Sequence, residues 1–289
     1  MVSRPVRPVS GGTLCLIGGA EDRAGPRVVL AEFLRLAGGE GARVAVVATA
    51  SSLGAEILDA YDALFHDLGA GEVLRLRPET RAEAEDPGLA ASVRDVDAVF
   101  MTGGNQLKLA AVVAGTAFGT AISAAYERGA VVGGTSAGAS AASEHMIAFG
   151  DEVDTPRQGT TASAAGLGLL PGVIVDQHFA QRNRYARLLS LVGRSPRLLG
   201  IGVDEDTAAV VRGGREMEVV GAGCVFVADG SQATSDAHLA ELGAPLLVSG
   251  VVVHTLPAGA RFDLVERRLV SFVESHLAHQ LRHQTEENQ

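Results

Sequence analysis

Short runs of valine, isoleucine and leucine alternate with longer amphipathic stretches rich in alanine and leucine through the first two hundred residues. This alternation is typical of repeated strand–helix–strand units, which build a mostly parallel sheet with helices on both faces. The expected fold class is therefore α/β, with a doubly wound, mostly parallel sheet. The stretches predicted as helices are Arg27–Leu36, Ala55–Leu68, Leu107–Arg128 and Tyr185–Val192. The runs predicted as strands are Thr13–Ile17, Arg43–Ala48, Glu72–Leu76, Ala98–Met101, Ala130–Val132, Val173–Val175 and Leu199–Val203.

The C-terminal third has a different pattern. Beyond Asp204 the apolar runs lie closer together and glycine-containing turns separate them, which predicts an antiparallel β extension of the same sheet. Its runs are Ala208–Val211, Glu216–Val220, Cys224–Ala228 and Leu246–Val253. The segment Gly150–Gly168, rich in small and acidic residues, is predicted to be a loop near the functional site.

The chain length fits one large domain. Its 289 residues exceed the usual size of a domain, but large α/β domains reach this length around one sheet. We expect an N-terminal extension over residues 1–12, a single α/β domain over residues 13–284 and a polar tail over residues 285–289.

Charge and composition argue against several kinds of partner. The formal net charge is −10, from 34 acidic against 24 basic residues, so we expect no nucleic-acid partner. No uncharged apolar run is long enough to span a bilayer, and the N-terminal residues do not resemble a signal peptide. We therefore expect no membrane association and a cytoplasmic location. Cys15 and Cys224 lie in apolar runs and are predicted to be buried thiols in a reduced compartment.

The strongest local signal for chemistry surrounds Ser136. A buried strand is followed by the pattern G-x-S-x-G over Gly134–Gly138 and then by a helix of small residues. This is the context of a nucleophile elbow, in which glycines permit a tight turn and the helix N-terminus faces a developing oxyanion. The alternative, a serine that caps the helix, is equally compatible with the pentapeptide alone.

A nucleophilic serine needs a base, and His178 is the leading candidate among eight histidines. It follows the C-terminal end of an apolar strand, where open α/β sheets bind their ligands. His254 ends a later strand and stays a reserve candidate. Three histidines share one face of a predicted C-terminal helix, but no acidic cluster accompanies them, so we expect no metal site. They are His276, His279 and His283.

The third member of such a triad is a carboxylate that orients the imidazole. Three acids in a row end the strand Leu199–Val203, which is costly unless each finds a partner or solvent. Glu205 is our choice, while spacing alone leaves Asp204 and Asp206 open.

Five blocks of sequence together resemble the cyanophycinase family. They occur in the family's order and are Ile17–Asp22, Thr102–Gln106, Gly134–Ala139, Asp176–Phe179 and Gly202–Thr207. The resemblance implies a serine exopeptidase related to the aspartyl dipeptidases, on a sheet like that of class I glutamine amidotransferases, and no cofactor. It implies Ser136, His178 and Glu205 as the triad, with the N–H groups of Gly104 and Ala137 as the oxyanion hole.

The resemblance also implies substrate contacts. They are Asn105, Gln106, Asp176, Gln177, Arg182, Arg184 and Arg187. Clustered guanidinium groups suit bidentate capture of carboxylates, although a solvated helix face would explain the three arginines as well. Many relatives carry Asp where this chain has Asn105. The acids of the 150–154 segment would hold a substrate arginine or form a solvated loop.

The resulting expectation is a hydrolase that releases β-Asp-Arg dipeptides from cyanophycin, a polymer with a poly-aspartate backbone and arginine branches. The alternatives are an α-aspartyl dipeptidase with the same triad, an α/β-hydrolase esterase that recruits a later histidine such as His254, and a non-catalytic domain that binds an acidic ligand. A homodimer is the expected assembly.

Overall fold

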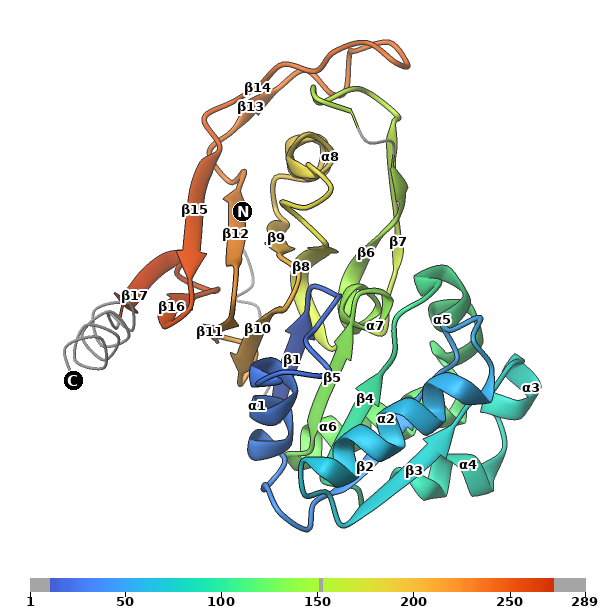
Figure 1. The fold of residues 1–289 in the computed structure, drawn as a ribbon. Helices are drawn as coiled ribbons and strands as arrows, with labels where there is room; N and C mark the ends of the chain where they lie inside the picture. Colours follow the sequence, from blue (N-terminus) through green and yellow to red (C-terminus); the bar gives the residue numbers. More distant parts are fainter. Residues whose placement is uncertain (1–10, 151–152, 273–289) are drawn as a thin grey trace, which may run out of the picture.

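The computed structural model describes residues 11–150 and 153–272, and Figure 1 shows its two main sheets. The larger sheet has nine strands in the order β17-β16-β11-β10-β1-β5-β4-β2-β3. Its strands β1, β5, β4, β2 and β3 are mutually parallel, and β10, β11, β16 and β17 extend it in antiparallel fashion. The strand bounds are β1 Thr13–Ile17, β2 Arg43–Val47, β3 Glu72–Leu76, β4 Ala98–Met101, β5 Val131–Thr135, β10 Thr207–Arg212, β11 Glu216–Gly221, β16 Ala260–Asp263 and β17 Arg268–Phe272.

A second sheet has six strands in the order β15-β12-β9-β8-β6-β7. Strands β6, β8 and β9 are parallel, while β12, β15 and β7 are antiparallel to their neighbours. Their bounds are β6 Ser143–Gly150, β7 Thr161–Ala165, β8 Leu170–Gln177, β9 Leu199–Val203, β12 Cys224–Asp229 and β15 Val252–Pro257. Two further short strands, β13 Thr234–Ser235 and β14 Val248–Ser249, pair only with each other among the described strands.

The prediction of a single sheet was therefore wrong. Strand β1 pairs with β5 on one side and with β10 on the other, so both of its edges are occupied. Strands β8 and β9, which were expected in the main sheet, pair with each other and with β6 and β12 instead. The predicted C-terminal strands are confirmed as antiparallel, but they are divided between the two sheets.

Helices cover both faces of the larger sheet, as predicted for a doubly wound fold. Helices α1 and α2 pack on one face, where Phe33, Phe65 and Phe100 form an aromatic cluster. Helices α5, α6 and α7 pack on the other face. The helix bounds are α1 Val28–Leu36, α2 Ala55–Asp67, α3 Arg81–Ala84, α4 Pro87–Ser92, α5 Gln106–Val113, α6 Ala117–Arg128, α7 Ala137–Ala142 and α8 Tyr185–Arg194.

Two predicted segments differ from the observed elements. The stretch predicted as one helix over Leu107–Arg128 is divided into α5 and α6, because Gly115 has a positive φ of 71° and Thr116 caps α6 by accepting from the N–H of Gly119. Part of the predicted loop Gly150–Gly168 forms β7, which pairs with β6.

No single described helix has the length and apolarity needed to span a membrane, and only the bent pair α5 and α6, which meet at 96°, passes on length and composition.

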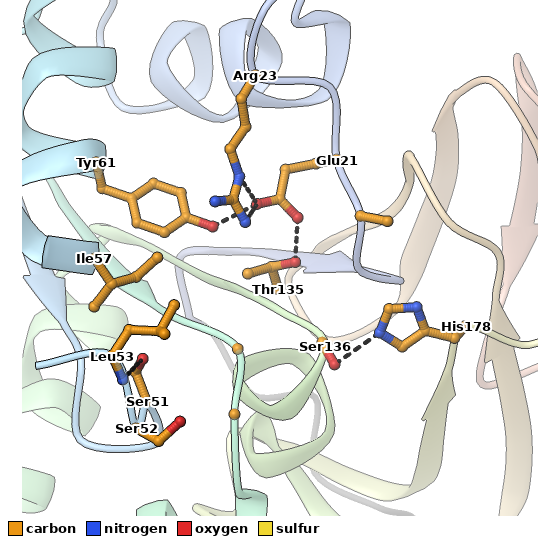
Figure 2. Close-up of a pocket in the computed structure, with 13 residues that line it drawn as sticks. Glu21, Arg23, Ser51, Ser52, Leu53, Ile57, Tyr61, Thr135, Ser136 and His178 are labelled. Carbon is orange, nitrogen blue, oxygen red and sulfur yellow. Dashed lines mark hydrogen bonds and ion pairs between the residues drawn. The ribbon is translucent and has the colours of Figure 1, made fainter.

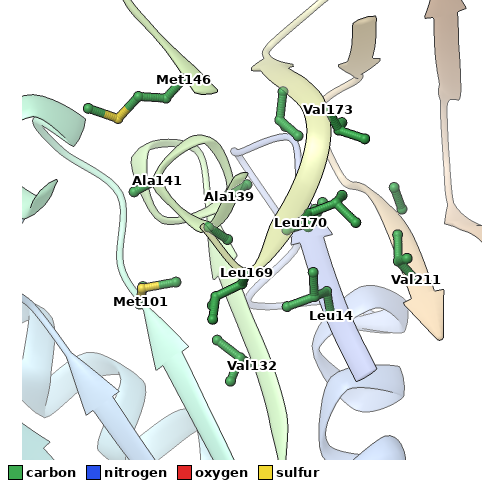
Figure 3. Packing of buried hydrophobic residues seen from close by; sticks show 14 of the residues in the cluster. Leu14, Met101, Val132, Ala139, Ala141, Met146, Leu169, Leu170, Val173 and Val211 are labelled. Carbon is green, nitrogen blue, oxygen red and sulfur yellow. The ribbon is translucent and has the colours of Figure 1, made fainter. Parts of the chain in front are cut away.

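Helix α7 lies between the two sheets, and Figure 3 shows the apolar side chains that surround it. All six of its residues are buried, and all are Ala, Gly or Ser. A Cβ added at Gly138 would lie 2.3 Å from the carbonyl oxygen of Met101 on β4. The small side chains therefore allow Leu170 and Val173 of the second sheet and Leu14 of the main sheet to share one core.

Predictions were also made for the two chain ends and for the two cysteines. The predicted tail over residues 285–289, most of the predicted extension over residues 1–12, and His276, His279 and His283 lie outside the described residues. Cys15 is a buried free thiol, and burial raises its pKa to about 12. Cys224 is also free but only partly buried, so the prediction of two buried thiols holds fully for Cys15 alone.

Candidate active site

Ser136 lies in the sharp turn between β5 and α7, as predicted for a nucleophile elbow. Its backbone has φ 51° and ψ −106°, a conformation that L-residues rarely adopt and that is concentrated at functional sites. The N–H of Ser136 donates to the carbonyl oxygen of Ile17, 2.9 Å away at the end of β1. The Ser136 hydroxyl makes no capping bond to α7, which removes the alternative of a capping serine.

His178 connects the serine to a carboxylate. Its Nε2 lies 3.0 Å from Oγ of Ser136, and its Nδ1 lies 2.6 Å from Oε1 of Glu205. His178 follows β8 and Glu205 lies in the turn between β9 and β10, so both follow the C-terminal ends of strands. The structure thus brings together the three residues predicted as a triad.

The alternatives for the acid and the base have other roles. Asp204 accepts from the N–H groups of Ala180 and Cys224, each at 3.0 Å, and Asp206 accepts from the N–H of Asp22 at 2.9 Å. Both aspartates therefore hold the turn that carries Glu205. His254 lies on β15, where its ring packs against Phe262 with a centroid distance of 4.8 Å. The chain order of serine, histidine and acid also differs from the order that the esterase alternative requires.

The glycine pair after β1 makes room for this arrangement. A Cβ at Gly18 would lie 2.0 Å from the carbonyl oxygen of Asp204, and a Cβ at Gly19 would lie 2.3 Å from Cε1 of His178. These distances are far below van der Waals contact, so only glycine fits at either position. The absence of side chains at Gly18 and Gly19 thus makes space for the imidazole of His178 and for the turn that carries Glu205.

We expect Gly19→Ala to lower kcat/KM by about a hundredfold, because the new methyl group must displace the His178 ring from Ser136. Gly38→Ala is the matched control, since Gly38 has a similar φ of 109° against 101° but nothing within 4 Å of its added Cβ. Both variants carry the same backbone strain, so only the first should lose activity beyond its loss of stability. Equal kcat/KM in the two variants would contradict this role of Gly19.

The electrostatics of the site keep His178 neutral. Burial lowers the pKa of His178 below its ordinary value of 6.5, the hydrogen bond with Glu205 raises it in part, and the positive charge of Arg182 lowers it again. A neutral imidazole can accept the hydroxyl proton of Ser136 at pH 7, as general base catalysis requires.

The pH dependence of kcat/KM should depend on these influences on the pKa of His178. We expect the acidic limb of kcat/KM to lie below pH 6.5 and to move to higher pH in Arg182→Gln, because that change removes a charge that disfavours the imidazolium ion. Arg35→Gln, on the exposed face of α1, should leave the limb in place. A limb that moves to lower pH in Arg182→Gln would refute this assignment of charges.

The predicted oxyanion hole has supporting geometry. Gly104 lines the pocket in front of Ser136 and has φ 139°, and a Cβ there would lie 2.1 Å from the carbonyl oxygen of Ala50. Ala137 is the first residue of α7, so its N–H has no acceptor within the helix. The donation of these two N–H groups to an oxyanion stays a prediction.

A pocket of about 290 Å³ opens beside Ser136, and Figure 2 shows its lining. It is formed by the segment after β1, the loop between β2 and α2, and one face of α2. The residues that sequence reasoning missed are Glu21, Arg23, Ser51, Ser52, Leu53, Ile57, Tyr61 and Thr135. Among them, only Glu21 and Thr135 lie in the family blocks, Ile17–Asp22 and Gly134–Ala139.

Three of the predicted substrate contacts lie together in a buried ion-pair group. Asp176 is completely buried and forms ion pairs with Arg184 at 3.4 Å and with Arg187, whose Nε lies 2.7 Å from Oδ2 of Asp176. The two arginines are 7% and 6% exposed. Asp176 thus has two charged partners inside the protein, as a buried carboxylate requires, and the group keeps one net positive charge. Contact of Arg184 and Arg187 with the substrate stays a prediction.

The other predicted contacts are placed as follows. Gln177 accepts a 2.6 Å hydrogen bond from Arg184, and the amide of Gln106 donates to the carbonyl oxygen of Ile147 on β6 at 2.9 Å. Asn105 caps α5 by accepting from the N–H of Lys108 at 3.1 Å, a role that aspartate could also fill. Arg182 is exposed, so its contact with substrate stays a prediction. Of the acids in the 150–154 segment, Asp154 accepts from Asn183, while Asp151 and Glu152 lie outside the described residues.

The fold and the site define a serine hydrolase, in which a strained elbow serine, a histidine and a glutamate form one hydrogen-bonded series. Comparison with known proteins gives its family. Residues 14–219 match the model of peptidase family S51, and the chain belongs to that family.

Curated relatives and solved structures agree with this assignment. The chain is 40% identical over 254 residues to a protein named cyanophycinase from Geminocystis herdmanii, covering 87% of this chain and 93% of the relative. It is 38% identical to a cyanophycinase from Trichormus variabilis, covering 89% of this chain and 87% of that one. A solved peptidase from an acI-B1 actinobacterium shares the fold, with a TM-score of 0.63, 24% identity and coverage of 88% of this chain and 97% of the other.

Proposed function

We propose that this protein is a cyanophycinase that releases β-Asp-Arg dipeptides from the poly-aspartate backbone of cyanophycin. The observation that carries the proposal is the hydrogen-bonded series of Ser136, His178 and Glu205, in a chain 40% identical to a named cyanophycinase over 87% of its length. A cytoplasmic location and a homodimeric assembly accompany the proposal as expectations from the sequence.

Ser136 is the nucleophile in the proposed mechanism. Its Oγ attacks the carbonyl carbon of the scissile amide while Nε2 of His178 takes the hydroxyl proton and Glu205 stabilises the imidazolium that forms. The oxyanion develops beside the N–H groups of Gly104 and Ala137. His178 then returns the proton to the leaving amine, and an acyl-enzyme ester remains on Ser136.

Water completes the cycle. It attacks the ester carbonyl and gives its proton to His178, which passes it to Oγ of Ser136 as the acid product leaves. The net reaction consumes one water and produces one carboxylate and one amine. His178 performs each of the proton transfers in this sequence.

The proposal is tested by incubating the purified protein with cyanophycin, with short β-Asp-Arg oligomers, and with α-linked Asp-Arg of the same composition. Mass spectrometry of the products should show β-Asp-Arg accumulating from the polymer, and Ser136→Ala should release none. Cleavage of the α-linked dipeptide with the polymer left intact would overturn the proposal in favour of an aspartyl dipeptidase. Binding of the oligomers without any turnover would favour the non-catalytic alternative.

A further inference from the structure

The pocket beside Ser136 contains a cation that the triad does not use. Arg23 lines this pocket together with the nucleophile and His178, and its side chain is 46% exposed (Figure 2). It comes from the segment between β1 and α1, and Figure 2 shows it beside Tyr61 of α2. Arg23 is therefore accessible to a ligand and shares a pocket with the nucleophile.

Glu21 and Tyr61 hold the guanidinium group of Arg23 in place. Its Nε and one terminal nitrogen lie 3.2 and 3.1 Å from Oε1 of Glu21, and its Cζ lies 4.9 Å from the centroid of the Tyr61 ring. Glu21 has no exposed side-chain surface and also accepts from the hydroxyl groups of Tyr61 and Thr135. Since Thr135 directly precedes Ser136, this network fixes Arg23 relative to the nucleophile.

The backbone that carries Arg23 is equally constrained. The Asp22 carboxylate accepts from the N–H groups of Ala24, Gly25 and Arg27 at 2.8 to 3.0 Å. The N–H of Asp22 donates to Asp206, the neighbour of the triad glutamate, at 2.9 Å. Arg23 thus belongs to a prearranged site, because little side-chain or loop entropy is left to lose when a ligand binds.

The charge that this pocket exposes to a ligand is the guanidinium of Arg23, because its partner Glu21 is buried. Glu21 is the acidic side chain in the lining, and it is buried beneath three donors. The remaining polar lining carries no negative charge. It consists of the hydroxyl groups of Ser51, Ser52, Tyr61, Thr135 and Ser136, the imidazole of His178 and the backbone of Gly103 and Gly104. A guanidinium fork at one end of a neutral pocket suits a carboxylate.

We propose that Arg23 binds a carboxylate of the substrate and thereby sets the charge specificity of this hydrolase, an inference that rests on the proposed function. Cyanophycin offers two kinds of free carboxylate, the α-carboxylate at the end of the backbone and the α-carboxylate of each arginine branch. Recognition of the former would restrict cleavage to chain ends, and recognition of the latter would require a branched unit. In both cases the group that Arg23 binds is a carboxylate close to the scissile bond.

The test uses β-Asp-Arg oligomers in three forms: unmodified, amidated at the backbone terminus, and amidated at the arginine carboxylates. In the wild type, we expect one amidation to lower kcat/KM by about tenfold to a hundredfold, and that amidation identifies the carboxylate. In Arg23→Gln, kcat/KM for the unmodified oligomer should fall by a similar factor, and the same amidation should then have no further effect. Arg23→Lys, which keeps the charge but loses the fork, should be intermediate.

Two comparisons keep the outcomes distinct. Arg35→Gln, which removes an exposed arginine of α1, should show the full wild-type response to amidation. Wild-type protein that cleaves all three oligomers equally would overturn the role of Arg23 while leaving the proposed function intact. An amidation effect that persists undiminished in Arg23→Gln would also overturn it, whereas a wild type that cleaves no oligomer at all would overturn the proposed function itself.

Discussion

Ser136→Ala should abolish hydrolysis of cyanophycin, lowering kcat by at least about 10⁴-fold while leaving the fold and substrate binding intact. The substitution removes the nucleophilic oxygen and almost no volume, and Ser136 is only partly buried. Product release followed by mass spectrometry gives the rate, and thermal unfolding verifies the fold. The His178→Ala and Ser136→Ala double variant should be no less active than either single variant, because the two groups act as one unit.

The neighbouring serines provide the control. Ser140 donates to the carbonyl oxygen of Val175 at 3.3 Å, and Ser143 donates to the carbonyl oxygen of Ser140 at 2.7 Å. Both hydroxyls are buried in backbone contacts, so Ser140→Ala and Ser143→Ala should lose stability rather than chemistry. Retention of activity in Ser136→Ala together with its loss in Ser140→Ala would show that the nucleophile has been misassigned.

Asp176→Ala should lower the free energy of unfolding by about 3–5 kcal/mol, because it leaves two buried guanidinium groups without their shared carboxylate. Urea unfolding measures the change. The companion variant Arg187→Met removes one charge of the same group, and its combination with Asp176→Ala should cost less than the sum of the two single changes.

An exposed ion pair is the matched control for this prediction. Asp59 and Arg75 form a pair between α2 and β3, with side chains 62% and 51% exposed. Asp59→Ala should cost less than about 1 kcal/mol, because water already solvates both charges. Similar costs for Asp176→Ala and Asp59→Ala would contradict the view that the Asp176 group is a buried structural network.

Local patterns in the sequence predicted the parts of the fold that depend on local chemistry. The strands β1 to β5 and the helices α1 and α2 were found from periodicity, and the elbow at Ser136 from its glycines. The division into two sheets could not be predicted in this way, because the pairing partner of a strand such as β8 is set by which edges other strands leave free.

The site was predictable where residues follow strand ends and less so where side chains meet across the fold. His178 and Glu205 were found because both follow the C-terminal ends of buried strands. The pairing of Asp176 with two arginines follows from the packing of α8, which spacing does not reveal, although an acid ending an apolar strand already required a partner. The network of Glu21, Tyr61 and Arg23 joins residues forty positions apart, and no local pattern connects them.

The division of the triad between two sheets makes catalysis depend on how the sheets are docked. Ser136 extends from the larger sheet, His178 from the smaller one, and Glu205 occupies the crossing from β9 to β10. Strand β10 then pairs with β1. This pairing joins the first strand of the residues that match the family model, 14–219, to a strand near their end. Neither sheet alone is a peptidase. Because the triad draws on both sheets, the protein can hydrolyse its substrate only when the two sheets are docked.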